Sequence, residues 1–277
     1  MLWLDGLLVP VDEARVSPFD HGLLVGDGVF ETLRVYDGVP FAWTRHHARL
    51  VRSAAGLGLR APGSQELRAA VDEVLAANRL TDGRVRVTVT GGPSPLGSER
   101  GGGPPTVIVV SAPATPWPPT VDVVIVPWSR NEHGAVAGLK TTSYAENVRA
   151  LAHALERGAG EAMFLNTRGE LCEATGSNVF VIRDGVVLTP PADAGCLLGV
   201  TRALVLELCA DHGVPAEEAA LGRAALGDAD EAFLTSSTRE VQPIGRVDGR
   251  ALPAAPGPTS EKLGSLLTEL IARNPDP

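Results

Sequence analysis

Lysine is nearly absent from this chain of 277 residues. Lys and Arg together number 24, yet lysine occurs only at Lys140 and Lys262. Arginine cannot lose its proton in a protein and cannot form a Schiff base, whereas lysine can do both. Lys262 lies in the polar part of a helical pattern and is expected at the surface. Lys140, in GLKTTSYAENV, is therefore the candidate for covalent chemistry.

Two segments have residues suited to binding a phosphate group. Thr201, in LLGVTRALV, stands at the start of a helical pattern, where free N–H groups and the helix dipole favour an anion. Ser237 and Thr238 belong to a run of four hydroxyl residues after a predicted strand. Each segment could equally be an ordinary helix cap or a polar turn. Arg49 could add positive charge or could be a solvated helix residue.

Glu173 adds a carboxylate to the candidate lysine and the two candidate phosphate-binding segments. Glu173, in LCEATGSNVF, precedes a predicted strand. Pyridoxal phosphate (PLP) needs a lysine that binds it, a carboxylate that keeps its ring nitrogen protonated, and a site for its phosphate. Lys140, Glu173 and the two hydroxyl-bearing segments together predict this cofactor.

Motifs for other cofactors and nucleophiles are missing. The glycines lack the spacing and context of a dinucleotide-binding turn, and neither a GxxxxGK[ST] nor a GxSxG sequence occurs. His46 and His47 are neighbours on a predicted helix and point in different directions. We therefore expect no metal site.

Six motifs follow one another between about Leu2 and Asp248: FDHGLLVGDGVFETLR, HHARL, LKTTSYAENV, LCEATGSNVFV, LLGVTRALV and FLTSSTREVQPI. In this order they resemble the class IV (fold type IV) PLP enzymes, which include branched-chain aminotransferase, D-amino-acid aminotransferase and 4-amino-4-deoxychorismate lyase. The resemblance implies a two-domain α+β fold of the D-amino-acid aminotransferase type. It also implies a homodimer with both cofactor sites near the interface.

The same resemblance implies a role for each site residue. Lys140 would bind PLP covalently, Glu173 would pair with the pyridine nitrogen, Tyr144 would contact the ring hydroxyl, and Leu197 would pack on the ring. The implied phosphate contacts are Arg49, Val200, Thr201, Ser237 and Thr238.

The segment Phe30-Glu31-Thr32 bears on which reaction is catalysed. A threonine at position 32 resembles the sequence of the aminodeoxychorismate lyases, in which this threonine is a proposed proton donor. Branched-chain aminotransferases typically have glycine at this place. D-amino-acid aminotransferases have tyrosine in place of Phe30 and an Arg-x-His pair that this chain lacks. We therefore expect a lyase that forms 4-aminobenzoate, a folate precursor, and pyruvate.

Two alternatives remain beside the lyase. One is an aminotransferase that acts on branched-chain L-amino acids or on D-amino acids with 2-oxoglutarate. The other is a non-catalytic binding protein, against which Lys140 argues. The substrate would be a small anionic amino compound. The candidate contacts of this substrate are Phe30, Arg34, Arg84, Arg86 and Arg100. Each of these arginines could also be a solvated surface residue.

The elements that position these residues are mixed strands and helices. Asp-Gly turns predict hairpins in LWLDGLLV, FETLRVYDGVPFA and NVFVIRDGVVLTP. Alternation predicts a strand at 84–90, and helices are expected near 44–57, with Thr44 as the cap, 64–79, 145–157, 201–212 and 260–273. Four prolines in SAPATPWPPT predict a linker at 115–120. It would join a small N-terminal α/β domain, 1–114, to a larger C-terminal domain, 121–277, that carries Lys140.

Composition limits the partners and the compartment. The net charge of −9 and pI of about 5.2 argue against nucleic-acid binding, which needs basic surface. No apolar run reaches the roughly 18 residues of a membrane span, and the first residues do not resemble a signal peptide. Three cysteines without CxxC spacing predict reduced thiols in a cytoplasmic protein.

Overall fold

The computed structural model describes all 277 residues, and the chain divides into two compact units. The first unit contains Met1–Thr115, Leu139–Tyr144 and Pro275–Pro277, and the second contains Pro116–Gly138 and Ala145–Asn274. Lys140 was expected in the C-terminal domain, but its segment, Leu139–Tyr144, belongs to the first unit. The cause is a set of backbone hydrogen bonds to that unit, described with the site below.

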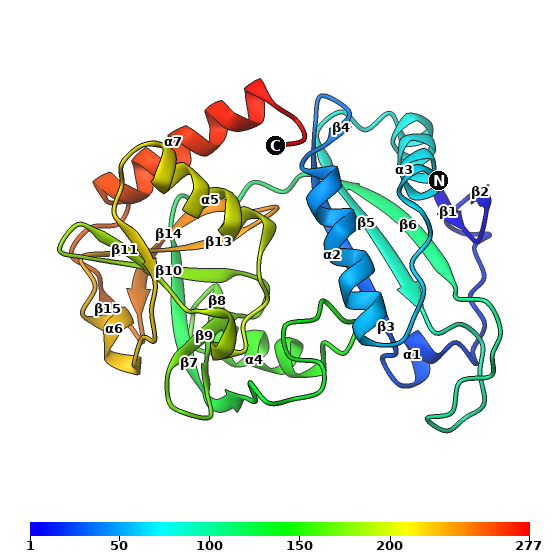
Figure 1. The fold of residues 1–277 in the computed structure, drawn as a ribbon, viewed down its shortest axis with the longest axis horizontal. Helices are drawn as coiled ribbons and strands as arrows, with labels where there is room; N and C mark the ends of the chain where they lie inside the picture. The colour runs from blue at the N-terminus through cyan, green and yellow to red at the C-terminus, as the bar shows by residue number, and fades with distance from the viewer. The chain divides into compact units, whose positions relative to one another are not determined.

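The first unit is an antiparallel sheet with two main helices. Its elements are β1 (Leu2–Leu4), β2 (Leu7–Val9), α1 (His21–Leu24), β3 (Gly28–Tyr36), β4 (Val39–Pro40), α2 (Trp43–Gly56), α3 (Ser64–Asn78), β5 (Gly83–Thr90) and β6 (Val107–Pro113). The six strands lie in the order β2-β1-β6-β5-β3-β4. In Figure 1, α2 crosses in front of β3 and β5.

Alternation along β3 and β5 sorts their side chains between two faces of this sheet. Val29, Leu33, Val85 and Val87 are buried and pack in one core with apolar side chains of α2 and α3. Phe30, Thr32 and Arg34 lie on the other face of β3, and their partners across the ladder on β5 are Thr88, Arg86 and Arg84. The predicted strand at 84–90 is confirmed, and its arginines lie on the face opposite the helices.

Helix α2 begins differently from the sequence expectation. Its N-cap residue is Ala42, in the left-handed region with φ of 55°, and no side chain of that residue caps the helix. Thr44 lies in the first turn, so the prediction that Thr44 is the cap is wrong. The predicted helix itself, near 44–57, is confirmed.

The second unit contains a larger mixed sheet. Its elements are β7 (Val121–Arg130), α4 (Ala145–Leu155), β8 (Glu161–Asn166), β9 (Leu171–Ala174), β10 (Asn178–Arg183), β11 (Val186–Thr189), the 3-10 turn η1 (Ala192–Ala194), α5 (Val200–Asp211), β12 (Ala216–Glu218), α6 (Arg223–Gly227), β13 (Glu231–Ser236), β14 (Glu240–Val247), β15 (Arg250–Ala251) and α7 (Pro258–Arg273). The strand order is β12-β11-β10-β13-β14-β7-β8-β9, with β15 beside β14.

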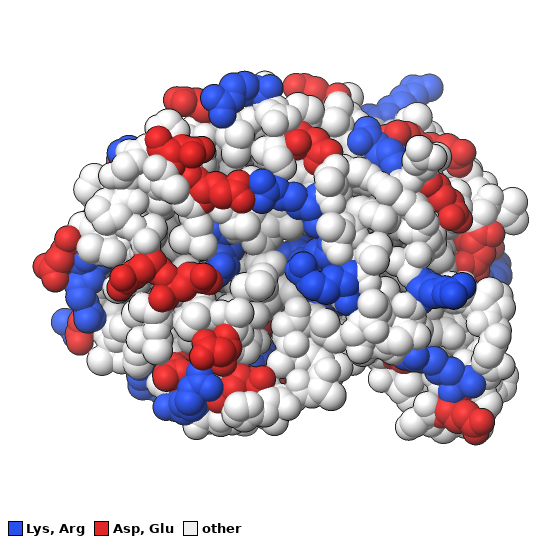
Figure 2. Space-filling model, viewed as in Figure 1, with Lys and Arg blue, Asp and Glu red and all other residues white.

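Helices cover this sheet and form its cores. Phe180 of β10 and Phe233 of β13 stack with centroids 4.8 Å apart in a core shared with α5 and α7. Cys172, Cys196 and Cys209 are buried and free of disulfides. No helix is long and apolar enough to span a bilayer. Acidic and basic side chains are interspersed over the face drawn in Figure 2.

Candidate active site

The segment that carries Lys140 lies along the start of β3. The amide of Phe30 donates to the Lys140 carbonyl at 3.1 Å, and the amide of Thr142 donates to the Gly28 carbonyl at 2.8 Å. The Lys140 amide donates to Ser53 Oγ of α2 at 3.1 Å. A Cβ on Gly28 would lie 2.9 Å from Thr142 Oγ1, so glycine permits this close approach. Strand β3 and helix α2 thus fix the lysine backbone.

Three predicted site residues lie around the ring of a fourth, Phe30. Lys140 Nζ lies 4.4 Å from the ring centroid, and Arg86 Cζ lies 3.6 Å from it. Tyr144 packs edge-to-face on the same ring, with centroids 5.3 Å apart. Arg86 donates to Thr88 Oγ1 at 3.2 Å and pairs with no carboxylate. Burial lowers the pKa of Arg86, opposed by Tyr144, but a guanidinium remains charged at neutral pH.

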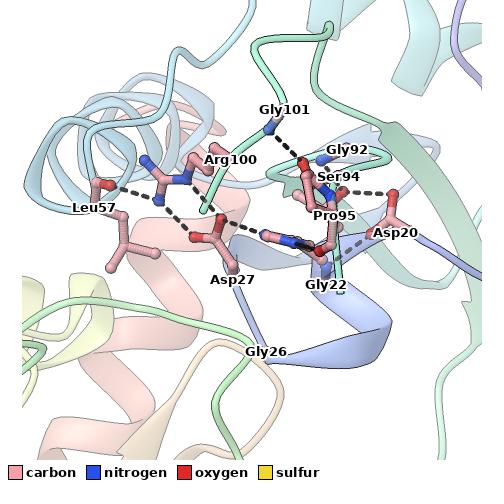
Figure 3. A network of polar contacts seen from close by, with 12 residues as sticks. Asp20, Gly22, Gly26, Asp27, Leu57, Gly92, Ser94, Pro95, Arg100 and Gly101 are labelled. Carbon is pink, nitrogen blue, oxygen red and sulfur yellow. Dashed lines mark hydrogen bonds and ion pairs between the residues drawn. The ribbon is translucent and has the colours of Figure 1, made fainter. Parts of the chain in front are cut away.

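The other candidate arginines have different surroundings. Arg34 pairs with Asp82 at 2.7 Å and also donates to two backbone carbonyls. Arg100 makes a bidentate pair with Asp27, at 2.7 and 2.6 Å (Figure 3). Arg84 is exposed and is the partner of Arg34 across the ladder. Arg34 and Arg100 are thus each paired with a carboxylate of the protein, whereas Arg86 is not.

Arg100 belongs to a network that holds the long loop 91–105, drawn in Figure 3. Besides Asp27, it donates to the Leu57 carbonyl at 2.7 Å. His21 Nε2 donates to the Pro95 carbonyl at 2.7 Å, and the Gly101 amide donates to Ser94 Oγ at 3.1 Å. These contacts tie the loop to the residues just before β3. Arg100 therefore has a structural role in this loop.

Arg49 is buried and paired, so it is not a solvated helix residue. Its Nε donates to Glu31 Oε1 at 2.7 Å, and its Nη2 donates to Glu31 Oε2 at 2.7 Å. His46 Nδ1, one turn earlier on α2, donates to the same Glu31 Oε2 at 2.6 Å. Glu31 lies on the helix-covered face of β3 and joins the strand to the helix. Removing one member of such a buried ion pair typically costs about 3–5 kcal/mol.

The electrostatics of this trio follow from burial and charge. Burial alone would raise the pKa of Glu31, but the charges and hydrogen bonds of Arg49 and His46 together hold it well below its usual range. Burial lowers the pKa of His46 despite the nearby Glu31, and the positive charges of Arg49 and Lys140 lower it further. Glu31 therefore stays ionised and keeps the Arg49 guanidinium in place.

In the second unit, Glu173 lies on the short strand β9. Its Oε2 accepts the Leu197 amide at 2.9 Å, and its Oε1 lies 3.9 Å from Arg130 Nε. Asn178 Nδ2 donates to the Leu197 carbonyl at 2.7 Å. Leu197 is thus held on both sides of its backbone, next to the carboxylate predicted to face a pyridine nitrogen.

The N-terminus of α5 has the features of an anion site. Its N-cap is Gly199, without a side-chain cap, so the Val200 and Thr201 amides lie in an uncapped first turn. A Cβ on Gly199 would lie 2.1 Å from Asn178 Oδ1, so only glycine fits there. Thr235 Oγ1, on the strand residue paired with Asn178, is buried and has no hydrogen-bond partner.

The turn that carries Ser237 and Thr238 is held by a buried ion pair. Arg239 donates to Glu161 Oε2 at 2.9 Å, and the Arg239 amide donates to Ser236 Oγ at 3.1 Å. The Arg239 guanidinium also lies 3.8 Å from the Trp117 ring centroid. Trp117 of the predicted linker therefore packs against Arg239 of this turn.

Comparison with known proteins identifies the family. The family model described as amino-transferase class IV matches residues 28–247. A protein of Methanocaldococcus jannaschii, provisionally named a branched-chain-amino-acid aminotransferase, is 36% identical over 91% of this chain and 89% of its own length. The D-alanine aminotransferase of Bacillus licheniformis is 33% identical over 96% of this chain and 95% of its own.

A solved structure shares the whole fold. It is a Legionella pneumophila protein provisionally named 4-amino-4-deoxychorismate lyase, with a TM-score of 0.89, 26% identity, and coverage of 94% of this chain and 96% of that one. The site and fold define a PLP-dependent enzyme of fold type IV. The chain belongs to the class IV aminotransferase family.

The residues present fit the cofactor of this family, PLP. The uncapped start of α5 and the unpartnered Thr235 hydroxyl suit a phosphate, and the half-buried Glu173 carboxylate suits a protonated ring nitrogen. Lys140 is the candidate for the covalent bond.

Sequence reasoning missed the residues that hold the predicted ones. Glu31 and His46 orient Arg49, Asn178 holds Leu197, and Glu161 holds the Arg239 turn. One signal was present: Glu31 interrupts the apolar face of a strongly alternating strand, which indicates a buried ion pair.

Proposed function

We propose that the protein is an aminotransferase that acts on branched-chain L-amino acids or on D-amino acids, with 2-oxoglutarate as the acceptor. The main supporting observation is that Lys140 Nζ and the Arg86 guanidinium lie against the same Phe30 ring, at 4.4 and 3.6 Å from its centroid. Arg86 has no acidic partner in the protein, which suits it to a substrate carboxylate. The aminotransferases among its relatives favour this reaction over the lyase.

Each side chain has a defined task in this proposal. Bound PLP supplies a carbonyl carbon for the amino group and a ring that accepts an electron pair. Lys140 Nζ holds the cofactor and then moves the proton of the substrate Cα. Glu173 keeps a proton on the ring nitrogen, Tyr144 hydrogen-bonds the ring hydroxyl, and Leu197 packs on the ring. The phosphate contacts are Arg49, Val200, Thr201, Ser237 and Thr238.

The reaction is tested by offering the purified protein D-alanine or L-leucine with 2-oxoglutarate and, in parallel, 4-amino-4-deoxychorismate. We expect oxo-acid formation and little 4-aminobenzoate. Thr32→Val, which keeps the volume but removes the hydroxyl, should leave transamination intact. Rapid 4-aminobenzoate formation that falls about 10²-fold in Thr32→Val would instead assign Thr32 as a proton donor and the enzyme as a lyase.

Arg86→Ala should raise KM for the amino acid and lower kcat/KM by about 10²-fold, because a charge-assisted bond to the carboxylate is lost. Arg84→Ala is the matched control, since Arg84 lies two residues away on the same strand but is exposed. Steady-state kinetics with several amino acids measure both variants. Equal losses in the two variants, or none in Arg86→Ala, would place the carboxylate elsewhere.

We also propose a cytoplasmic homodimer. Large apolar side chains are exposed between β2 and the start of β3, and isolated proteins rarely leave such surface open. Leu7, Val11 and Leu23 are each more than 65% exposed, and Phe19 is 52% exposed. The three free cysteines are compatible with a reducing compartment.

A further inference from the structure

Helix α2 lacks a cap from its own sequence. Its N-cap, Ala42, has no side-chain acceptor, although the first turn of any helix leaves amides without an intrahelical partner. Alanine is among the poorer N-cap residues, and replacing a good cap by alanine weakens a helix start about fivefold. The amides of this first turn therefore need an acceptor from elsewhere in the chain.

Asp276, more than 230 residues later, provides that acceptor. Its Oδ1 accepts the Thr44 amide at 2.9 Å, and its Oδ2 accepts the Thr44 hydroxyl at 2.6 Å. A carboxylate at this end of a helix is also favoured by the helix dipole. Asp276 thus makes the hydrogen bond that an N-cap side chain normally makes to the second helical residue.

The residues on either side of Asp276 reinforce the contact. The Ala42 amide donates to the Pro275 carbonyl at 2.7 Å, and Arg45 Nε donates to the Pro277 carbonyl at 2.8 Å. Both neighbours are prolines, which restrict the backbone and reduce the entropy lost on docking. Three consecutive residues therefore hold the first turn of α2.

The capped turn leads directly to the buried trio. The His46 amide makes a backbone hydrogen bond to the Ala42 carbonyl, at 3.1 Å. His46 Nδ1 and Arg49 Nη2 share Glu31 Oε2, at 2.6 and 2.7 Å. Fraying of the first turn would release His46 from Glu31 and loosen the carboxylate that orients Arg49.

We propose that Asp276 is a positioning residue for the cofactor phosphate. It caps α2, keeps His46 against Glu31, and thereby fixes the Arg49 guanidinium. This inference rests on the proposed contact between Arg49 and the phosphate. Asp276 is exposed, and its side chain accepts hydrogen bonds from the amide and the hydroxyl of Thr44.

The test compares Asp276→Ala with Asp276→Asn, because asparagine caps helices as well as aspartate does. Two quantities are measured: hydrogen exchange of the α2 first-turn amides in the holoenzyme, and the Kd of PLP for protein freed of its cofactor. Asp276→Ala should speed exchange and weaken PLP binding, each about fivefold, whereas Asp276→Asn, which keeps the acceptor and loses only the charge, should change each by less than about twofold. Combining Asp276→Ala with Arg49→Ala should weaken PLP binding no more than Arg49→Ala alone.

The possible failures are distinguishable. Unchanged exchange in Asp276→Ala would show that the cap is dispensable. Faster exchange with an unchanged Kd for PLP would show that Asp276 stabilises the helix start without affecting cofactor binding, and would overturn its positioning role. If Arg49→Ala binds PLP as tightly as the unmodified protein, the phosphate contact assigned to Arg49 in the proposed function is the step that fails.

Discussion

Lys140→Ala is expected to lose covalently bound PLP and to lower turnover by at least about 10³-fold, because one amine both holds the cofactor and moves a proton. Lys140→Arg should be no better, since a guanidinium keeps the charge but is neither nucleophile nor base. Both losses are measured by the absorption of the cofactor bound to lysine and by the rate of oxo-acid formation.

The chain offers a matched control in its only other lysine. Lys262 lies on α7 and is exposed, so Lys262→Ala should keep both the spectrum and the activity. Borohydride reduction followed by peptide mapping identifies the modified residue directly. Recovery of the adduct on Lys262, or an active Lys140→Ala variant, would refute the assignment.

Local patterns predicted much of the fold because their causes are local. Each of the three predicted Asp-Gly turns lies in a hairpin with positive φ at both residues, at Asp5–Gly6, Asp37–Gly38 and Asp184–Gly185. This is the backbone that joins two twisted strands with a two-residue turn. Alternation likewise located β5, where Val85 and its apolar neighbours are buried together.

Contacts between distant parts of the chain could not be read in the same way. The cap of α2 comes from Asp276, and the partner of Arg100 is Asp27, 73 residues away. Arg86 and Arg100 looked equivalent in the sequence as candidates for binding a substrate carboxylate. The structure distinguishes them, because Arg100 is paired with Asp27 and Arg86 has no acidic partner. The segment at Lys140 was placed in the wrong unit because its hydrogen bonds run to Gly28 and Phe30.

The choice of reaction depended on too few residues. Thr32 favoured the lyase, yet the Bacillus licheniformis relative is named a D-alanine aminotransferase and the Methanocaldococcus jannaschii relative is provisionally named a branched-chain-amino-acid aminotransferase. The two reactions share the lysine, the ring-nitrogen carboxylate and the phosphate site. One hydroxyl on β3 is therefore weak evidence about which bond breaks, whereas the six motifs together indicated the family and its cofactor.

Glu173→Gln is expected to retain PLP but lower turnover by about 10²-fold, equivalent to about 3 kcal/mol in the transition state. Glutamine keeps the size of the side chain and an oxygen that can accept the Leu197 amide, now at 2.9 Å from Oε2. It removes the negative charge that keeps a proton on the ring nitrogen, so the ring accepts electrons less readily. Cofactor content and kcat measured on the same sample separate these two effects.

Glu170→Gln is the matched control, because Glu170 lies just before β9 and pairs with Arg168 at 2.8 Å rather than with a predicted site residue. It should change neither cofactor content nor kcat. Loss of PLP from Glu173→Gln would make Glu173 a binding residue instead of an electronic one. Near-normal turnover would mean that another group keeps the ring nitrogen protonated, and would refute the role assigned to Glu173. A fall in kcat confined to Glu173→Gln therefore identifies the charge itself, and not the packing of this hairpin, as the cause.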